Sequence, residues 1–328
     1  MTDREADDRP EIPAPLNPEF RQEPLPEFQP KTFEEDPGAP VRIQALLDAP
    51  SYRRADQDID FLECDEAHGL RLQLDYLKPE LLLTGEGVRH TVVVFGSTRI
   101  AEPATAQRRV EQLERELRAS PEDRGLQRKL KIAGRILANS RYYAIAREFG
   151  RLVGESGYGS QDCRLVIMTG GGPGIMEAAN RGAFEAGAKT IGLNIDLPHE
   201  QFPNPYISPE LCFRFRYFAL RKMHFLQRAV ALVAFPGGFG TMDELFETLT
   251  LIQTRTIKPV PVVLVGRQYW ERVVDFEFLL DEGVIDSEDR DSFWFAETAE
   301  EAWQGILDWH RQGGEPLFPP TANGGTSK

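Results

Sequence analysis

The sequence predicts an α/β fold: a Rossmann-like doubly wound parallel sheet flanked by helices, with an N-terminal helical extension. Two observations support this prediction. From His90 onward, short apolar runs rich in β-branched residues alternate with longer helical patterns. The runs are continuously apolar, as in strands that are buried on both faces of a parallel sheet. Two of them also end in glycine-rich turns that lead directly into helical patterns, at residues 170–174 and 236–240.

The strands and helices follow from these patterns in order. Strands are expected at residues 91–95, 165–169, 190–193, 212–215, 229–235, 261–265 and 292–295. Helices are expected at residues 108–118, 123–148, 175–186, 218–228, 242–253, 269–280 and 298–309. Ligands of such sheets bind at the carboxyl ends of the strands, where both glycine turns fall.

The ends of the chain differ in composition from its middle. Residues 1–40 are rich in Pro, Asp and Glu, which indicates a disordered arm, and residues 313–328 indicate a disordered tail. Residues 41–312 are expected to form a single Rossmann-like domain. Within it we expect an N-terminal helical extension at 41–88 and a charged helical insert at 101–140.

Composition narrows the function classes. The net charge of -14 argues against a nucleic-acid partner, although a phosphorylated small molecule needs only a local binding site. No apolar run approaches the roughly 20 residues of a membrane span, so no membrane partner is expected. The acidic start of the chain differs from a secretory signal, and the three cysteines form no metal or disulfide pattern. We therefore expect a cytoplasmic protein.

The turn at residues 236–240 has the features of a phosphate cradle. Gly237, Gly238 and Gly240 let backbone N–H groups approach an anion at the start of a helix, and Thr241 adds a hydroxyl. Glu244 follows one turn later, which suggests chemistry as well as binding. The alternative is structural, because Thr241 and Glu244 also have the spacing of a capping box.

Two further turns add candidate binding residues. Gly171, Gly172 and Gly174 could wrap a phosphate or simply allow a tight turn into a helix. After the first strand come Gly96, Ser97 and Arg99, whose guanidinium could bind phosphate or carboxylate. The alternative for Arg99 is an ordinary surface position after a turn.

Arg221 and Lys222 lie on the helical pattern that precedes the strand at 229–235. A solvated basic face is the usual explanation for such residues. The histidines form no metal-binding pattern, and no serine occupies a nucleophile elbow. We therefore expect no metal site and no serine-hydrolase chemistry.

Together these motifs resemble the LOG (Lonely Guy) family, whose characterised members are cytokinin-activating phosphoribohydrolases. The resemblance rests on the triple glycine that runs into Gly174-Ile175-Met176, on Pro236 to Glu244, and on the pair Arg221-Lys222. It covers about residues 91–309. Glu177 stands where short members carry Gly, and residues 197–206 look like the longer bacterial subgroup. Similar sequences often carry the label lysine decarboxylase, but no Schiff-base lysine motif supports it here.

The resemblance implies hydrolysis of the N-glycosidic bond of a nucleoside 5'-monophosphate, either AMP-like or a cytokinin ribotide, to free base and ribose 5-phosphate. It implies Glu244 and Arg221 as catalytic residues, no cofactor, and a homodimer or higher homo-oligomer. The residues that would bind substrate and phosphate are Gly96, Ser97, Arg99, Gly171, Gly172, Gly174, Met176, Glu177, Lys222, Gly237, Gly238, Gly240 and Thr241. The alternative is a non-hydrolytic nucleotide or cofactor carrier on the same fold.

Overall fold

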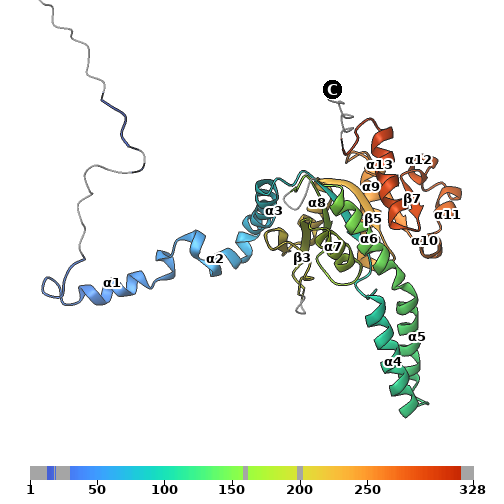
Figure 1. Cartoon of the computed structure of the whole chain (residues 1–328). Helices are drawn as coiled ribbons and strands as arrows, with labels where there is room; N and C mark the ends of the chain where they lie inside the picture. The colour runs from blue at the N-terminus through green and yellow to red at the C-terminus, as the bar shows by residue number, and fades with distance from the viewer. Residues whose placement is uncertain (1–12, 18, 20–29, 158–161, 198–201, 319–328) are drawn as a thin grey trace, which may run out of the picture. The chain divides into compact units, whose positions relative to one another are not determined.

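The computed structural model describes residues 13–17, 19, 30–157, 162–197 and 202–318 (Figure 1). The chain divides into two compact units, Met1–Ala67 and His68–Lys328. Most of the arm predicted at 1–40 and of the tail predicted at 313–328 lies outside the described residues. The helical extension predicted at 41–88 is shared between the two units.

The first unit contains short helices. They are α1 (Ala39–Leu47), η1 (Pro50–Tyr52), η2 (Ala55–Gln57), α2 (Ile59–Glu63) and η3 (Asp65–Ala67). The carboxylate of Asp58 caps α2 by accepting a hydrogen bond from the N–H of Phe61. Large apolar side chains such as Leu46 and Ile59 are exposed in this unit.

The second unit is built on a seven-stranded sheet, in which the strand pairings of the described residues are parallel. The strands are β1 (His90–Phe95), β2 (Leu165–Thr169), β3 (Thr190–Ile195), β4 (Cys212–Phe215), β5 (Ala229–Ala234), β6 (Val262–Val265) and β7 (Phe293–Ala296). Their order is β4-β3-β2-β1-β5-β6-β7. The predicted doubly wound α/β fold is confirmed. From β1 the chain adds β2, β3 and β4 on one side and then β5, β6 and β7 on the other, so the direction in which strands are added reverses between β1 and β5.

Helices cover both faces of this sheet. Successive residues of β1 point to opposite faces, so Val93 and Phe95 join one core while Val92 and Val94 join the other. The first core is closed by α3 (His68–Gly85), α8 (Phe218–Gln227), α9 (Phe239–Gln253), α10 (Arg267–Val273) and α11 (Phe276–Asp281). The second core is closed by α6 (Arg141–Glu155), α7 (Ile175–Glu185) and α13 (Ala299–Gln312).

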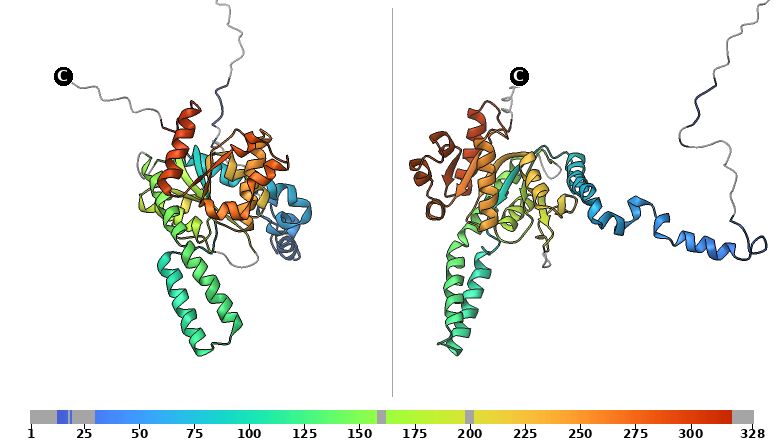
Figure 2. Two further views of the ribbon diagram at one scale, coloured as in Figure 1. Left: turned by 90° about the vertical axis from the view of Figure 1, so that its right-hand side faces the viewer. Right: turned by 180° about the vertical axis from the view of Figure 1, so that it is seen from behind.

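The predicted insert is a helical hairpin. It consists of α4 (Pro103–Ala119) and α5 (Arg124–Asn139), which lie side by side in Figure 2. The single helix predicted at 123–148 is wrong, because the chain leaves α5 at Ser140 and starts α6 at Arg141. Asp123 caps the start of α5 by accepting hydrogen bonds from Gly125 and Leu126.

The helix predicted at 269–280 is also interrupted. Val274 and Asp275 have extended backbones that separate α10 from α11. The Asp275 side chain then caps α11 by accepting a hydrogen bond from the N–H of Phe278. The short helices η4 (Pro209–Leu211) and α12 (Ser287–Arg290) complete the unit.

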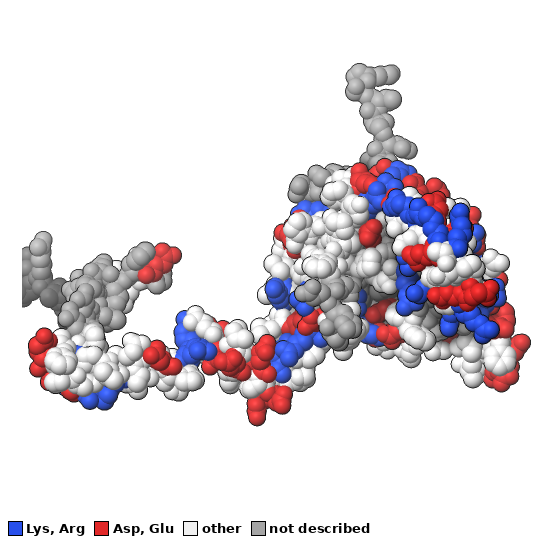
Figure 3. All heavy atoms as spheres, turned by 90° about the horizontal axis from the view of Figure 1, so that it is seen from below, with Lys and Arg blue, Asp and Glu red and all other residues white. Residues whose placement is uncertain are grey.

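Many charged side chains on the surface form pairs of opposite sign. Acidic and basic groups are interspersed on the face seen in Figure 3. One partly buried pair connects α3 to the end of α8, because Arg228, the C-cap of α8, donates to both carboxylate oxygens of Glu80 on α3, one of them at 2.7 Å. Within the described residues, no helix is both long and apolar enough to cross a membrane.

Candidate active site

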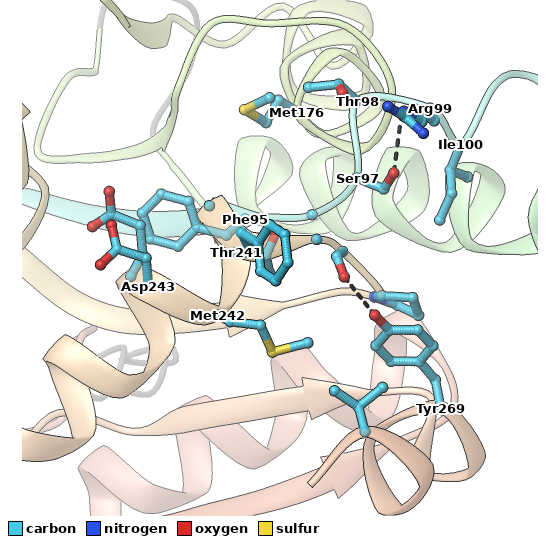
Figure 4. Close-up of a pocket in the computed structure, with 18 of the residues that line it drawn as sticks. Phe95, Ser97, Thr98, Arg99, Ile100, Met176, Thr241, Met242, Asp243 and Tyr269 are labelled. Carbon is cyan, nitrogen blue, oxygen red and sulfur yellow. Dashed lines mark hydrogen bonds between the residues drawn. The ribbon is translucent and has the colours of Figure 1, made fainter.

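A cavity of about 860 Å³ opens at the carboxyl ends of β1 and β5, where the strand order reverses (Figure 4). The loop after β1, the loop after β5 and the first turns of α9 line it. Ten of the predicted site residues meet here: Gly96, Ser97, Arg99, Met176, Arg221, Gly237, Gly238, Gly240, Thr241 and Glu244.

Helix α9 begins at Phe239, three residues earlier than predicted. Gly238 is its N-cap, so Thr241 lies inside the first turn and cannot close a capping box with Glu244. The capping-box alternative is therefore wrong. The N–H groups of Phe239, Gly240 and Thr241 precede the first intrahelical bond, which runs from Met242 to the Gly238 carbonyl at 3.0 Å. Since these N–H groups have no acceptor in the described part of the chain, this helix end offers donors and partial positive charge to the cavity.

The glycines of this turn differ in what surrounds them. A Cβ on Gly237 would lie 2.1 Å from the Thr241 hydroxyl, so packing alone demands glycine there. A Cβ on Gly238 or Gly240 would meet no atom within 4 Å. Neither of these two has a positive φ. Protein packing therefore gives no reason for glycine at 238 and 240, whereas close approach of a ligand does.

The loop after β1 forms the opposite wall. The Ser97 hydroxyl accepts a hydrogen bond from the N–H of Arg99 at 3.1 Å, as drawn in Figure 4. A Cβ on Gly96 would lie 2.5 Å from Ile175, so this glycine allows β1 and α7 to approach. Arg99 is exposed at the cavity wall.

The second glycine turn lies against the first loop and does not line this cavity. Gly174 has a φ of 78°, and its Cβ would come within 2.3 Å of the Ser97 carbonyl. Gly171 donates to the Thr169 hydroxyl at 3.0 Å, and Asn204 donates to the Gly172 carbonyl at 3.2 Å. These contacts place Gly171, Gly172 and Gly174 in a packed turn that supports the first loop.

Arg221 of α8 reaches the cavity beneath this turn. Its Nε donates to the carbonyl oxygen of Leu193 at 2.7 Å, which fixes the guanidinium. Its Cζ lies 5.1 Å from the centre of the Phe225 ring. Within the described residues, its two terminal nitrogens form no hydrogen bond. They remain available to an anion.

Glu244 lies in the second turn of α9 and is 8% exposed. Burial raises the pKa of its carboxyl to about 7, although Lys222 and Arg221 oppose this increase. Among the described residues its carboxylate has no hydrogen-bond or ion-pair partner. A buried carboxyl with a pKa near neutrality and no partner is typical of functional sites.

Two predicted residues have other partners. Lys222 does not line the cavity; it pairs with Asp243, which does, at 2.8 Å and with Glu247 at 3.0 Å. Glu177 accepts a hydrogen bond from the Tyr143 hydroxyl at 2.8 Å, also outside it.

The structure adds residues that the sequence motifs did not indicate. The Tyr269 hydroxyl of α10 donates to the Gly237 carbonyl, as Figure 4 shows. Ile132, Ile136 and Asn139 of α5 form part of the wall, so the helical insert contributes to the cavity. No local motif marks these positions, because they reach the cavity only through the tertiary fold.

In the described part of the chain, no three His, Cys, Asp or Glu residues cluster as metal ligands.

Comparison with known proteins agrees with the motifs. A family model described as "Possible lysine decarboxylase" matches residues 176–306. The cytokinin riboside 5'-monophosphate phosphoribohydrolase LOG3 of Arabidopsis thaliana is 28% identical over 140 residues, 42% of this chain and 63% of its own length. The resemblance to the LOG family is confirmed. The rice protein "Probable cytokinin riboside 5'-monophosphate phosphoribohydrolase LOG4" is also 28% identical, over 42% of this chain. The chain spans only 59% of that rice relative's length.

A solved structure also resembles this chain. The molybdenum cofactor carrier protein of Chlamydomonas reinhardtii is 19% identical with a TM-score of 0.40. The match covers 67% of this chain and 99% of that protein.

Proposed function

We propose that this LOG-like protein hydrolyses the N-glycosidic bond of nucleoside 5'-monophosphates, releasing the free base and ribose 5-phosphate. One observation supports this most strongly. Glu244 and Arg221, each with unused hydrogen-bonding groups, line the same cavity as the free amides of α9. An anion site, a fixed cation and a buried carboxyl are what such a reaction requires.

In this proposal the 5'-phosphate binds at the start of α9. The N–H groups of Phe239, Gly240 and Thr241 would donate to its oxygens, and the open space at Gly238 and Gly240 admits it. Binding at the phosphate then holds the ribose one helical turn further along, near Glu244.

Glu244 would act at C1' of the ribose. When the bond from C1' to the base nitrogen breaks, positive charge develops on the sugar, and a nearby carboxylate stabilises it or orients the attacking water. Water supplies the hydroxyl that bonds to C1' and the proton that leaves with the base. Arg221, fixed by its bond to the Leu193 carbonyl, would bind the substrate or stabilise the ionised carboxylate of Glu244.

The decisive experiment incubates the protein with AMP, GMP, CMP and a cytokinin ribotide and separates the released bases. Wild type should release at least one base, and Glu244→Gln should bind the same nucleotide while releasing none. Nucleotide binding without base release by wild type would support the carrier function instead. Unchanged turnover by Glu244→Gln would exclude the proposed mechanism.

We also propose that the protein forms a homo-oligomer. Phe218 and Met223 of α8 and Phe246 of α9 are large apolar side chains that remain exposed. Such side chains gather at subunit interfaces. Light scattering on the purified protein tests this, since a monomer mass would contradict it.

A further inference from the structure

A second cavity of about 460 Å³ adjoins the candidate active site. It lies between the end of α5, the start of α6 and helix α10, and it shares Asn139, Tyr269 and Val273 with the first cavity. We call it the arginine pocket, because Arg135, Arg141 and Arg272 line it together with Ala138, Tyr142 and Gln268. None of its lining residues is acidic.

The charge of this pocket is unusual for the chain. Acidic residues outnumber Lys and Arg by 52 to 38, and many arginines of the described structure form ion pairs with carboxylates. Arg135 and Arg272 have no ion-pair or hydrogen-bond partner among the described residues. Among the described residues, Arg141 has no ion-pair partner and donates a hydrogen bond of 2.9 Å to the Tyr142 hydroxyl, with its guanidinium over that ring. Three cations without a counter-charge around one hollow favour an anion there.

Tyr269 connects the arginine pocket to the phosphate cradle. Its hydroxyl donates to the carbonyl of Gly237, next to the amides at the start of α9. Its ring lines both cavities, and Arg272 lies on the same short helix. A phosphate at α9 and a group in the arginine pocket would therefore both lie beside this one side chain.

We propose that the arginine pocket binds a second phosphoryl group beside the one held at α9. This inference rests on the proposed function, since it assumes that α9 holds the 5'-phosphate. The second group is carried either by the nucleotide itself, as in a nucleoside 5'-diphosphate, or by free phosphate or pyrophosphate. Guanidinium groups suit this ligand because they bind phosphate oxygens through two donors at once.

The test measures binding to the full-length protein by titration calorimetry. Every protein in this test also carries Glu244→Gln, so that nucleotides are bound but not hydrolysed, and wild type here means the protein with all three arginines intact. Probes are AMP, ADP, inorganic phosphate and pyrophosphate, the last two with and without saturating AMP. The variant is Arg135→Gln with Arg272→Gln, and its matched control is Arg124→Gln with Arg128→Gln, which removes the same charge elsewhere on α5. Circular dichroism confirms that both variants keep the fold.

If the nucleotide carries the second group, wild type should bind ADP about tenfold more tightly than AMP. This advantage should disappear in the pocket variant and persist in the control. If a free anion is the ligand, pyrophosphate or phosphate should bind AMP-loaded wild type and the control but bind the pocket variant at least tenfold more weakly.

The proposal is overturned if neither ADP nor the free anions distinguish the pocket variant from the control. Its failure is separable from that of the proposed function. AMP hydrolysis and its loss in Glu244→Gln test the proposed function without involving the three arginines. Anion binding that depends on the arginines, without AMP hydrolysis, would support the proposal for the arginine pocket and contradict the proposed hydrolase function.

Discussion

The Nε of Arg221 donates a hydrogen bond to the carbonyl oxygen of Leu193 at 2.7 Å, so β3 fixes the guanidinium of α8. Arg221 lines the cavity, and in the described part of the chain its two terminal nitrogens form no hydrogen bond. An arginine can bond to the Leu193 carbonyl and present further donors to a ligand at the same time, because its donors form a rigid planar fork.

Arg221→Lys should therefore lower kcat/KM for nucleotide hydrolysis by roughly 100-fold while the fold is kept. A lysine ammonium that bonds to Leu193 is a point charge and cannot also present a second fixed donor. Steady-state kinetics and thermal melts test this, with Arg109→Lys on α4 as a control. An activity within twofold of wild type would show that the fork geometry is not used.

The raised pKa of Glu244 predicts how stability depends on pH. Because its folded pKa of about 7 lies above the ordinary 4.5, the folded protein holds this proton to a higher pH than the unfolded chain does. The stability contributed by the protonated group is thus complete below about pH 4.5 and is lost as pH rises through 7. Glutamine cannot ionise, so Glu244→Gln should gain stability relative to wild type between pH 4 and 8, by about 3 kcal/mol at most.

Urea unfolding at several pH values measures this difference. Glu300→Gln is a suitable control, because Glu300 is exposed on α13 and does not line the cavity. A difference between Glu244→Gln and wild type that is independent of pH would contradict the raised pKa.

Gly237 and Gly238 should respond differently to alanine. Gly237→Ala forces a Cβ into the Thr241 side chain and should destabilise the protein by about 1–3 kcal/mol. Gly238→Ala places its Cβ in open space and should change stability by less than about 0.5 kcal/mol. It should nevertheless raise the KM for nucleotide, by about tenfold, because the methyl group occupies the proposed phosphate position.

Melting curves and kinetics on the two variants separate packing from binding. If Gly238→Ala leaves the KM unchanged, the start of α9 does not hold the phosphate.

Tyr269→Phe removes one hydroxyl and keeps the ring. The Gly237 carbonyl then loses its donor, which should lower stability by about 1 kcal/mol and let the cradle loop move. We expect the KM for nucleotide to rise a few-fold with little change in kcat, since the hydroxyl positions the loop and does not touch the ribose. A loss confined to kcat would instead place Tyr269 in the chemical step.

The sequence predicts the sheet well, because its strands are largely apolar runs and three of them, β1, β2 and β6, end directly before a glycine. Helix boundaries are less predictable where the residue types and the tertiary packing favour different backbone conformations. At α9 the glycines at 238 and 240 weaken the helical pattern, yet the backbone already turns at Phe239. At Ser140 and Val274 the helical pattern continues through a break that tertiary packing imposes.

The candidate site shows the same limit. Arg221, Glu244 and the turn at α9, which the motifs single out, line one cavity, because β1 and β5 are neighbours and their carboxyl ends adjoin. They cannot separate glycines that face a cavity from glycines that allow close packing, as at Gly174. Tyr269 and the residues of α5 that line the cavity come from distant segments of the chain, and no spacing in the sequence predicts their presence there.

The pairing of β1 with β5 joins segments that are far apart in the chain, and the cavity exists only where both loops are in place. A partly folded chain that lacks this pairing has no cavity to offer. Any ligand of the cavity therefore binds the completed sheet alone and raises the melting temperature of the whole second unit. A thermal shift with nucleotide thus reports correct assembly of the sheet as well as binding.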